Sequence, residues 1–145
     1  MRIVVQRVKS ASLSVEGKIV SEIKTGLLVF AGVCIGDTQQ QVVKSAKKIS
    51  TLRIFEENGK MNKSVIDIDG EVLLVSNFTL CTKDVSGARP DFGLSASRDE
   101  AKSLYLALAD ELDTLGVKVK LGVFGADMQI SAHLDGPTTI YKEIQ

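Results

Sequence analysis

The chain of 145 residues has no tryptophan, a single histidine and only two cysteines. These scarcities limit the chemistry that the sequence can carry. One histidine and two distant cysteines, Cys34 and Cys81, do not form the ligand cluster of a zinc site. The spacing of the cysteines indicates no disulfide framework, and their scarcity is typical of a reducing cytosol. Glycine-rich phosphate-binding motifs are also missing, so we expect neither a metal nor another cofactor.

The sequence also lacks an excess of charge and a long apolar run. Lysine plus arginine and aspartate plus glutamate number 18 each, so a strongly basic nucleic-acid binder is not indicated, although a local basic patch is compatible with zero net charge. No apolar run reaches transmembrane length, and the first residues do not have the architecture of a signal peptide. We therefore expect a soluble cytoplasmic protein with no membrane partner, formed by a single domain over residues 1–145.

Local signals predict a chain made mostly of strands with two helices. Glu16-Gly17 and Asn58-Gly59 are typical of hairpin turns. Capping boxes predict that one helix begins at Asp37, with Gln40 three residues on, and that another begins after Ser97, with Glu100. The predicted strands cover residues 2–8, 11–15, 18–23, 26–33, 53–56, 71–80, 117–124 and 128–133, with a last short strand after 137 and a loop at 83–97.

The order of these elements indicates the fold class. Hairpins at the start argue against a simple alternating strand–helix–strand sheet. We expect an α/β protein of the α+β type, in which a curved mixed or antiparallel sheet, or a barrel-like β core, packs against two helices.

One stretch could carry a nucleophile. Gly32-Val33-Cys34-Ile35-Gly36 has the shape of a nucleophile elbow with cysteine in place of serine, between a predicted strand and a predicted helix. His133 would then have to be the base. The same pattern also arises in an ordinary glycine-rich turn, so a cysteine hydrolase and a purely structural turn are both hypotheses here.

Two polar segments stand at the ends of strand-like runs. Ser76-Asn77-Phe78-Thr79-Leu80 closes an apolar strand, and Asp135-Gly136-Pro137-Thr138-Thr139 lies near the C-terminus. Taken alone, the first could be a surface strand end and the second an ordinary turn. Together they resemble the paired SQFTL and NxGPVT motifs of the D-aminoacyl-tRNA deacylases. The resemblance continues in order through residues 1–8, 26–29, 36–38, 52–55, 59–62, 87–90, 116–119 and 122–128.

The resemblance implies a homodimeric hydrolase that removes D-amino acids, and also glycine, from the 3′ end of tRNA. In such a protein the Gly136-Pro137 bond is cis and reaches into the pocket of the partner subunit, where it excludes L side chains. The implied catalytic residues are Thr79, Phe78, Gly136 and Pro137. The implied substrate-binding residues are Ser76, Asn77, Leu80, Arg7, Met128 and Asp135.

The implied mechanism relies on the backbone. The N–H groups around Phe78 and Thr79 would stabilise the oxyanion, and such a donor is typically worth about 3–4 kcal/mol. Thr79 could be the nucleophile, or the ribose 2′-hydroxyl could help to activate water; we favour the second because the sequence offers no obvious general base. Asn77 and Leu134 replace the Gln and Asn of the two motifs. The alternative function is therefore a divergent tRNA-binding member with weak catalysis.

Overall fold

The computed structural model describes residues 1–83 and 87–145, and the elements within them confirm the α+β class. The helices are α1 (Gln39–Thr51) and α2 (Arg98–Thr114), with a short 3₁₀ helix, η1 (Phe78–Cys81). The strands are β1 (Arg2–Val15), β2 (Lys18–Ile23), β3 (Gly26–Gly32), β4 (Phe55–Glu57), β5 (Lys60–Lys63), β6 (Glu71–Ser76), β7 (Lys118–Leu121) and β8 (Gln129–Glu143).

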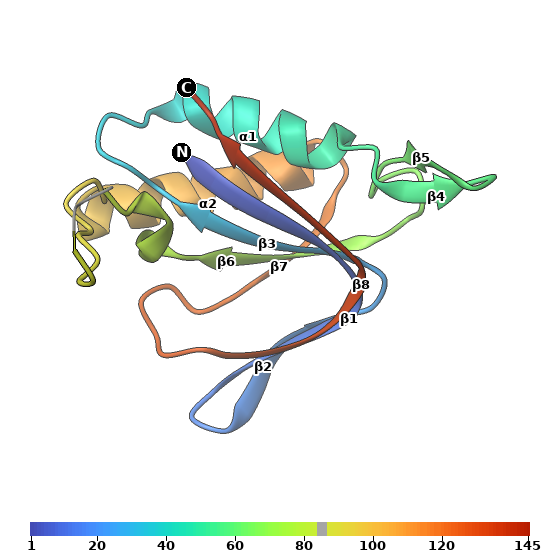
Figure 1. The fold of residues 1–145 in the computed structure, drawn as a ribbon, viewed down its shortest axis with the longest axis horizontal. Helices are drawn as coiled ribbons and strands as arrows, with labels where there is room; N and C mark the ends of the chain where they lie inside the picture. The colour runs from blue at the N-terminus through green and yellow to red at the C-terminus, as the bar shows by residue number, and fades with distance from the viewer. Residues whose placement is uncertain (84–86) are drawn as a thin grey trace.

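The main sheet is mixed and is organised around β1. The order β2-β1-β3-β6-β7 is completed by β8, which also pairs with β1 (Figure 1). Strand β1 is antiparallel to β2, β3 and β8, whereas β3, β6 and β7 run parallel to one another. Both α1 and α2 pack on the same side of this sheet (Figure 1). Strands β4 and β5 form a separate hairpin.

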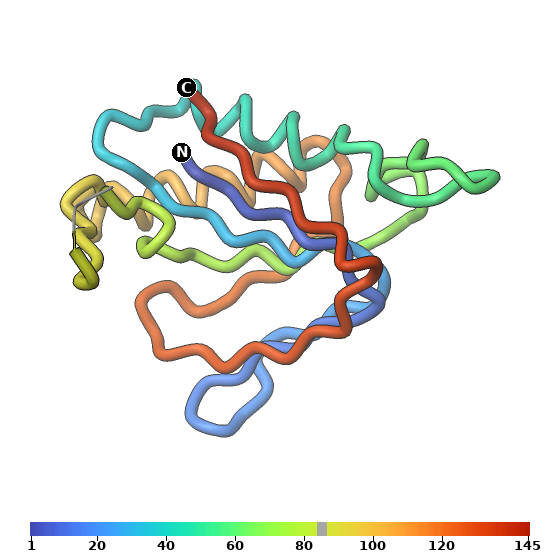
Figure 2. The backbone as a smooth tube through the Cα atoms, viewed as in Figure 1, coloured from blue at the N-terminus to red at the C-terminus, as the bar shows by residue number. Residues whose placement is uncertain are grey.

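The long strands β1 and β8 bend together, and this bend curls the sheet. Their register shifts between Gln6 and Val8 and again between Val8 and Ser10. Extra residues in one strand of a pair bend it and increase its twist. Figure 2 shows both strands turning at the same place. The first half of β1 therefore pairs with β3 and the second half with β2, which gives a nearly closed, barrel-like sheet.

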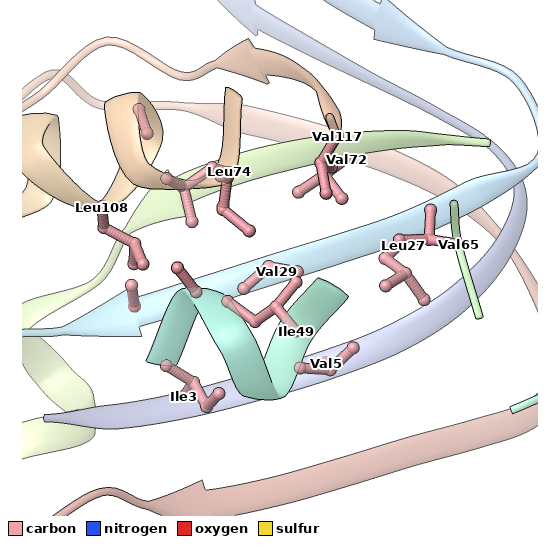
Figure 3. Packing of buried hydrophobic residues seen from close by; sticks show 14 of the residues in the cluster. Ile3, Val5, Leu27, Val29, Ile49, Val65, Val72, Leu74, Leu108 and Val117 are labelled. Carbon is pink, nitrogen blue, oxygen red and sulfur yellow. The ribbon is translucent and has the colours of Figure 1, made fainter. Parts of the chain in front are cut away.

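The central strands are buried on both faces, as is usual for parallel strands. On the helix side, Val29 of β3 and Leu74 of β6 pack with Ile49 of α1 and Leu108 of α2 (Figure 3). Inside the curve, a second cluster is made of Val8, Ala11, Leu13, Ile23, Leu28, Leu73 and Val75. This second cluster forms the floor on which the candidate site is built.

The predicted start of α2 is confirmed and that of α1 is wrong by one residue. Ser97 and Glu100 form the capping box of α2. The capping box of α1 uses Thr38 and Gln41, not Asp37 and Gln40. Asp37 turns away from the helix because its carboxylate accepts the Cys34 N–H at 2.7 Å and also contacts the Met1 amino group.

Several strand limits also differ from the prediction. The hairpin turns at Glu16-Gly17 and Asn58-Gly59 are confirmed, with positive φ at all four residues. Strand β6 ends at Ser76 rather than Leu80, and β8 is one strand from Gln129 to Glu143 that includes Gly136-Pro137. In the predicted loop at 83–97 the described residues form only isolated bridges, and 84–86 lie outside the described residues. No helix in the described part of the chain is long and apolar enough to span a membrane.

Helix α2 is fixed to β6 by a buried tyrosine. The Tyr105 hydroxyl donates a hydrogen bond to the Leu74 carbonyl oxygen at 2.8 Å. Burial raises the pKa of Tyr105 to about 12, so the hydroxyl stays protonated at neutral pH and keeps its donor. The contact holds α2 two residues before β6 ends at Ser76, where the first motif begins.

Candidate active site

The first motif forms a turn because Asn77 caps it. The Asn77 Oδ1 atom accepts the Thr79 N–H at 3.1 Å and the Thr79 hydroxyl at 2.6 Å. An asparagine before a helical turn typically takes up an otherwise unpaired backbone donor in this way. The Asn77 N–H donates to the Ala31 carbonyl oxygen at 2.8 Å, which ties the cap to β3. The chain therefore leaves the sheet directly after Ser76, and η1 follows.

The carboxyl end of η1 is held by two further contacts. The Arg2 Nη1 atom donates to the carbonyl oxygens of Leu80 at 3.0 Å and Thr82 at 2.8 Å. Cys81 forms a disulfide with Cys34, with 5.7 Å between the Cα atoms. Below the turn, a Cβ on Gly32 would lie 2.9 Å from both the Asn77 carbonyl oxygen and the Leu80 Cβ. Only glycine allows β3 to approach η1 so closely.

A cavity of about 560 Å³ opens beside this turn. Its size is that of a small-molecule site, and its lining is mainly apolar. Among the predicted site residues, Ser76, Asn77, Phe78 and Met128 line it, whereas Thr79 and Leu80 belong to the same turn without lining it. The remaining lining residues are Phe30, Val33, Val75, Ser95, Ala96, Arg98, Ala101, Phe124, Gly125, Ala126 and Ile130.

The cavity offers hydrogen-bond donors but no acid or base. Of the described residues that line it, Arg98 alone carries an ionisable side chain, and a guanidinium does not act as a proton acceptor at neutral pH. Phe78 is 58% exposed and meets the Phe92 ring edge-on, with 5.2 Å between centroids. Within residues 1–83 and 87–145 the Phe78 N–H donates no hydrogen bond, so it is a free donor at the cavity edge.

The second motif lies in a bulge of β8. Gln6 pairs with Thr139 and Val8 pairs with Leu134. Between these two pairs the chain advances two residues along β1 but five residues along β8. The Gly136-Pro137 bond is cis, which confirms the prediction. Neither Gly136 nor Pro137 lines the 560 Å³ cavity of the same chain. The two motifs are therefore not brought together within one copy of the chain.

Arg7 anchors this bulge from β1. Its Nε atom lies 3.2 Å from the Asp135 carbonyl oxygen and 3.2 Å from the Asp135 carboxylate, and Nη1 contacts the Ile54 carbonyl oxygen. Gly136 has φ of 119°, and a Cβ there would lie 2.7 Å from Thr138 Oγ1 and 2.9 Å from Arg7 Nη2. Arg7 and Asp135, both predicted substrate-binding residues, thus form one cluster around the Gly-Pro step.

The cysteine elbow is not formed. Cys34 is bonded to Cys81, so it has no free thiol in this structure, although the spacing of the two cysteines indicated no disulfide framework. The predicted base is also misplaced for this role. Cys34 follows β3 at the end where Gly32 pairs with Arg2, whereas His133 pairs with Ser10, eight residues further along β1. The sequence pattern at 32–36 is a structural turn after β3.

Comparison with known families decides the relationship of the chain. The model of the family described as D-Tyr-tRNA(Tyr) deacylase matches residues 4–143. The chain belongs to this deacylase family. It is 47% identical to a D-aminoacyl-tRNA deacylase of Clostridium tetani, over 97% of this chain and 95% of the relative. It is 46% identical to a D-aminoacyl-tRNA deacylase of Aquifex aeolicus, over 97% of this chain and 95% of the relative.

Solved structures share the fold of this deacylase-family chain. A protein described as c-Myc DNA Unwinding Element Binding Protein superposes with a TM-score of 0.94 at 39% identity, over 100% of this chain and 99% of the other. A probable eukaryotic D-amino acid tRNA deacylase has a TM-score of 0.84 at 17% identity, over 99% and 98%. At that identity the second likeness concerns the fold alone.

Some lining residues of the deacylase-family cavity were not predicted. Ser95 comes from the segment before α2, Arg98 is the first residue of α2, and Phe124 comes from the connection between β7 and β8. Phe124 lies in the segment at 122–128, which carries part of the resemblance, so it could have been predicted as a site residue. No pattern in the sequence indicated Ser95 as a site residue, although its hydroxyl donates to the Phe78 carbonyl oxygen at 3.1 Å.

Proposed function

We propose that this protein hydrolyses the ester bond of D-aminoacyl-tRNA and releases the free D-amino acid and tRNA. The observation that carries the proposal is the apolar cavity edged by Ser76, Asn77 and Phe78 in a chain of the deacylase family. Achiral glycine esters are accepted as well, because steric exclusion of an L side chain does not reject glycine. The chain acts as one domain in the cytoplasm, where aminoacylated tRNA is its substrate.

The chemistry is supported by what the cavity offers. Water attacks the ester carbonyl, and the free N–H of Phe78 stabilises the negative charge that develops on the carbonyl oxygen. The Thr79 N–H is already donated to Asn77 Oδ1, so it joins only if that hydrogen bond opens. Since no described lining residue is a base, the 2′-hydroxyl of the terminal ribose assists the water.

Thr79 serves the turn rather than attacking the ester. Its hydroxyl donates to Asn77 Oδ1 at 2.6 Å, and an amide oxygen is too weak a base to activate it. Leu80 packs under the same turn against Gly32. We therefore assign Phe78 to oxyanion stabilisation and Thr79 to positioning. Ser76, Asn77 and Met128 form the edge and wall that receive the substrate.

The complete site needs a second copy of the chain. Gly136 and Pro137 do not line the cavity of their own chain, so a homodimer in which they reach the partner's cavity is the arrangement we propose. Strand β8 suits such an interface because it pairs with β1 alone among the described strands and exposes Leu134 and Tyr141. In this dimer Arg7 and Asp135 hold the Gly-Pro step in place for the substrate's ammonium group.

The decisive experiment compares D-Tyr-tRNA and L-Tyr-tRNA as substrates of the purified protein. We expect rapid release of D-tyrosine and little release of L-tyrosine. The Cys34→Ala variant should still release D-tyrosine and not L-tyrosine, because Cys34 is a disulfide partner of the turn and not a nucleophile, whereas a cysteine nucleophile would predict complete loss of turnover. Equal hydrolysis of both esters would contradict the chiral mechanism. Binding of tRNA without hydrolysis of either ester would support the weakly catalytic alternative instead.

A further inference from the structure

Arg2 lies outside the substrate cavity but contacts the turn that edges it. It is the first residue of β1, and its side chain is 18% exposed. We propose that Arg2 is a positioning residue for deacylation, which holds the carboxyl end of η1 so that Phe78 keeps its place at the cavity edge. The proposal rests on the proposed function, because it assigns a residue to that reaction.

The contacts of Arg2 fit this role. A single nitrogen, Nη1, donates to the carbonyl oxygens of Leu80 at 3.0 Å and Thr82 at 2.8 Å, one on each side of Cys81. Hydrogen bonds from a charged donor are stronger than neutral ones. A cation at the carboxyl end of a helical turn also faces the negative end of the turn's dipole. Arg2 therefore stabilises the end of η1 that Asn77 does not reach.

The guanidinium also joins the turn to β8. Arg2 pairs with Gly32 of β3 on one side and with Glu143 of β8 on the other. Its Nη2 atom lies 3.6 Å from the Glu143 carboxylate. The strand that carries Gly136-Pro137 and the turn that carries Phe78 are thus connected through one side chain.

The guanidinium of Arg2 is not fully satisfied by its surroundings. Its Nε atom is buried and has no hydrogen-bond partner among the described residues. A buried donor without a partner costs free energy. This cost offsets part of what the two Nη1 hydrogen bonds contribute, and those bonds require a donor that reaches two carbonyl groups at once.

The turn needs such support because it is short. Helix η1 has only four residues and cannot fix its own position. A catalytic group displaced by about 1 Å can lose roughly a hundredfold in rate. Loosening the carboxyl end of η1 should therefore lower kcat, while the cavity walls that bind the substrate stay in place and KM changes little.

The kinetic test uses Arg2→Met, which removes the donors, and Arg2→Lys, which keeps the charge and can reach one carbonyl. We expect kcat on D-Tyr-tRNA to fall at least tenfold in Arg2→Met with KM within twofold, and Arg2→Lys to recover part of the loss. The matched control is Arg53→Met. Arg53, which lies just before β4, also donates to a carbonyl, that of Asn62 in β5 at 2.6 Å, away from both motifs, so its loss should leave both constants unchanged. A kcat of Arg2→Met within twofold of the wild type overturns the proposal.

A second measurement does not depend on activity. The Leu80 N–H donates to the Asn77 carbonyl oxygen within the turn, and its hydrogen exchange reports on η1 directly. We expect this exchange to be at least tenfold faster in Arg2→Met, while the Val29 amide in β3 keeps its protection. Equal acceleration of both amides, or no change at Leu80, would mean that Arg2 does not hold the turn. If the wild type fails to hydrolyse D-Tyr-tRNA, the proposed function fails, and the exchange rates still decide whether Arg2 holds η1.

Discussion

The two motif segments of this protein are held in opposite ways. The turn at 76–81 is fixed at both ends, by Asn77 at its start and by Arg2 and the Cys34–Cys81 disulfide at its end. The segment at 135–138 remains within a strand, bulges away from β1, and has Arg7 as its polar anchor. The turn edges the cavity of its own chain, whereas the bulge does not.

This difference separates two requirements of the reaction. An oxyanion donor must stay fixed while charge develops, because its value comes from needing no reorganisation. A group that enters the site from another copy must first project from its own chain. A turn fixed at both ends therefore suits the oxyanion donor. A bulge in β8, which pairs with β1 alone among the described strands, suits the group that enters another copy.

The largest effect should follow from opening the disulfide at the rigid turn. Cys34 and Cys81 are 47 residues apart, and closing a loop of that length stabilises the folded state by about 4 kcal/mol in the chain-entropy account. Reduction should therefore lower the melting temperature by roughly 10 °C. Thermal unfolding with and without a thiol reductant measures it. Cys34→Ser is the control, since reductant should not lower its melting temperature further. Identical curves for oxidised and reduced wild type would contradict the prediction.

The next largest effect should come from the bulge. In Gly136→Ala the new Cβ would lie 2.7 Å from Thr138 Oγ1 and 2.9 Å from Arg7 Nη2, at a φ of 119° that side chains rarely adopt. The segment must shift, and we expect the rate on D-Tyr-tRNA to fall by about a hundredfold, or roughly 2.7 kcal/mol. Initial rates on D- and L-Tyr-tRNA measure the change.

The matched control for this substitution is Gly17→Ala. Gly17 also has positive φ, at 75°, but a Cβ there meets no atom within 4 Å. This control carries the backbone cost alone, about 1 kcal/mol of stability, and should keep the wild-type rate. Similar rates for the two variants would show that the Gly-Pro segment has no part in the reaction.

The contrast also explains which features the sequence could predict. The hairpin turns at 16–17 and 58–59 and the capping box at Ser97 depend on neighbouring residues, and they were predicted correctly. The end of β6 was not, because Phe78 and Thr79 favour strands, and the turn is set by the Asn77 side chain together with a bond to Ala31 of another strand. Local preference lost to a tertiary contact.

The disulfide and the bulge could be predicted only from the way the strands are arranged in the sheet. Cys34 and Cys81 meet because β3 and β6 lie side by side in parallel, which no spacing in the sequence reveals. Proline usually argues against a strand interior, so the run around Gly136-Pro137 was divided into two strands. In the folded chain the bulge leaves this step outside the regular pairing, and β8 continues through it. The candidate site residues were predicted from the resemblance to the family. The structure shows that the turn edges the cavity of its own chain, whereas Gly136 and Pro137 do not line it.

A smaller effect is expected at Thr79. If water, ribose and the Phe78 N–H carry the reaction, Thr79→Ala should lower the rate on D-Tyr-tRNA by less than about tenfold, because it removes one hydrogen bond to Asn77 worth about 1 kcal/mol. Thr79→Ser keeps the hydroxyl and should have nearly the wild-type rate. Complete loss of turnover in Thr79→Ala with tRNA binding intact, or a trapped acyl-Thr79 adduct, would make Thr79 the nucleophile.

The smallest effect concerns Leu134, which stands directly before the bulge where the family motif has Asn. Leu134 pairs with Val8 and is 39% exposed, so its replacement removes little buried apolar surface. The amide of Leu134→Asn would lie beside a segment that has few anchors besides Arg7. We expect the rate on D-Tyr-tRNA to stay equal or rise a few fold, with unfolding free energy changed by less than about 1 kcal/mol.

The control for Leu134 is Ile19→Asn, the same kind of change on β2. Ile19 is 64% exposed and lies outside both motifs, so its replacement should alter neither rate nor selectivity. A rise in rate confined to Leu134→Asn would show that the bulge of this protein is held less firmly than an asparagine would hold it. A clear fall in rate would instead mean that the apolar side chain serves the bulge, either by packing or at the proposed subunit interface. Because the turn at 76–81 is untouched by this substitution, either change in rate would come from the bulge or from the interface that β8 is proposed to form.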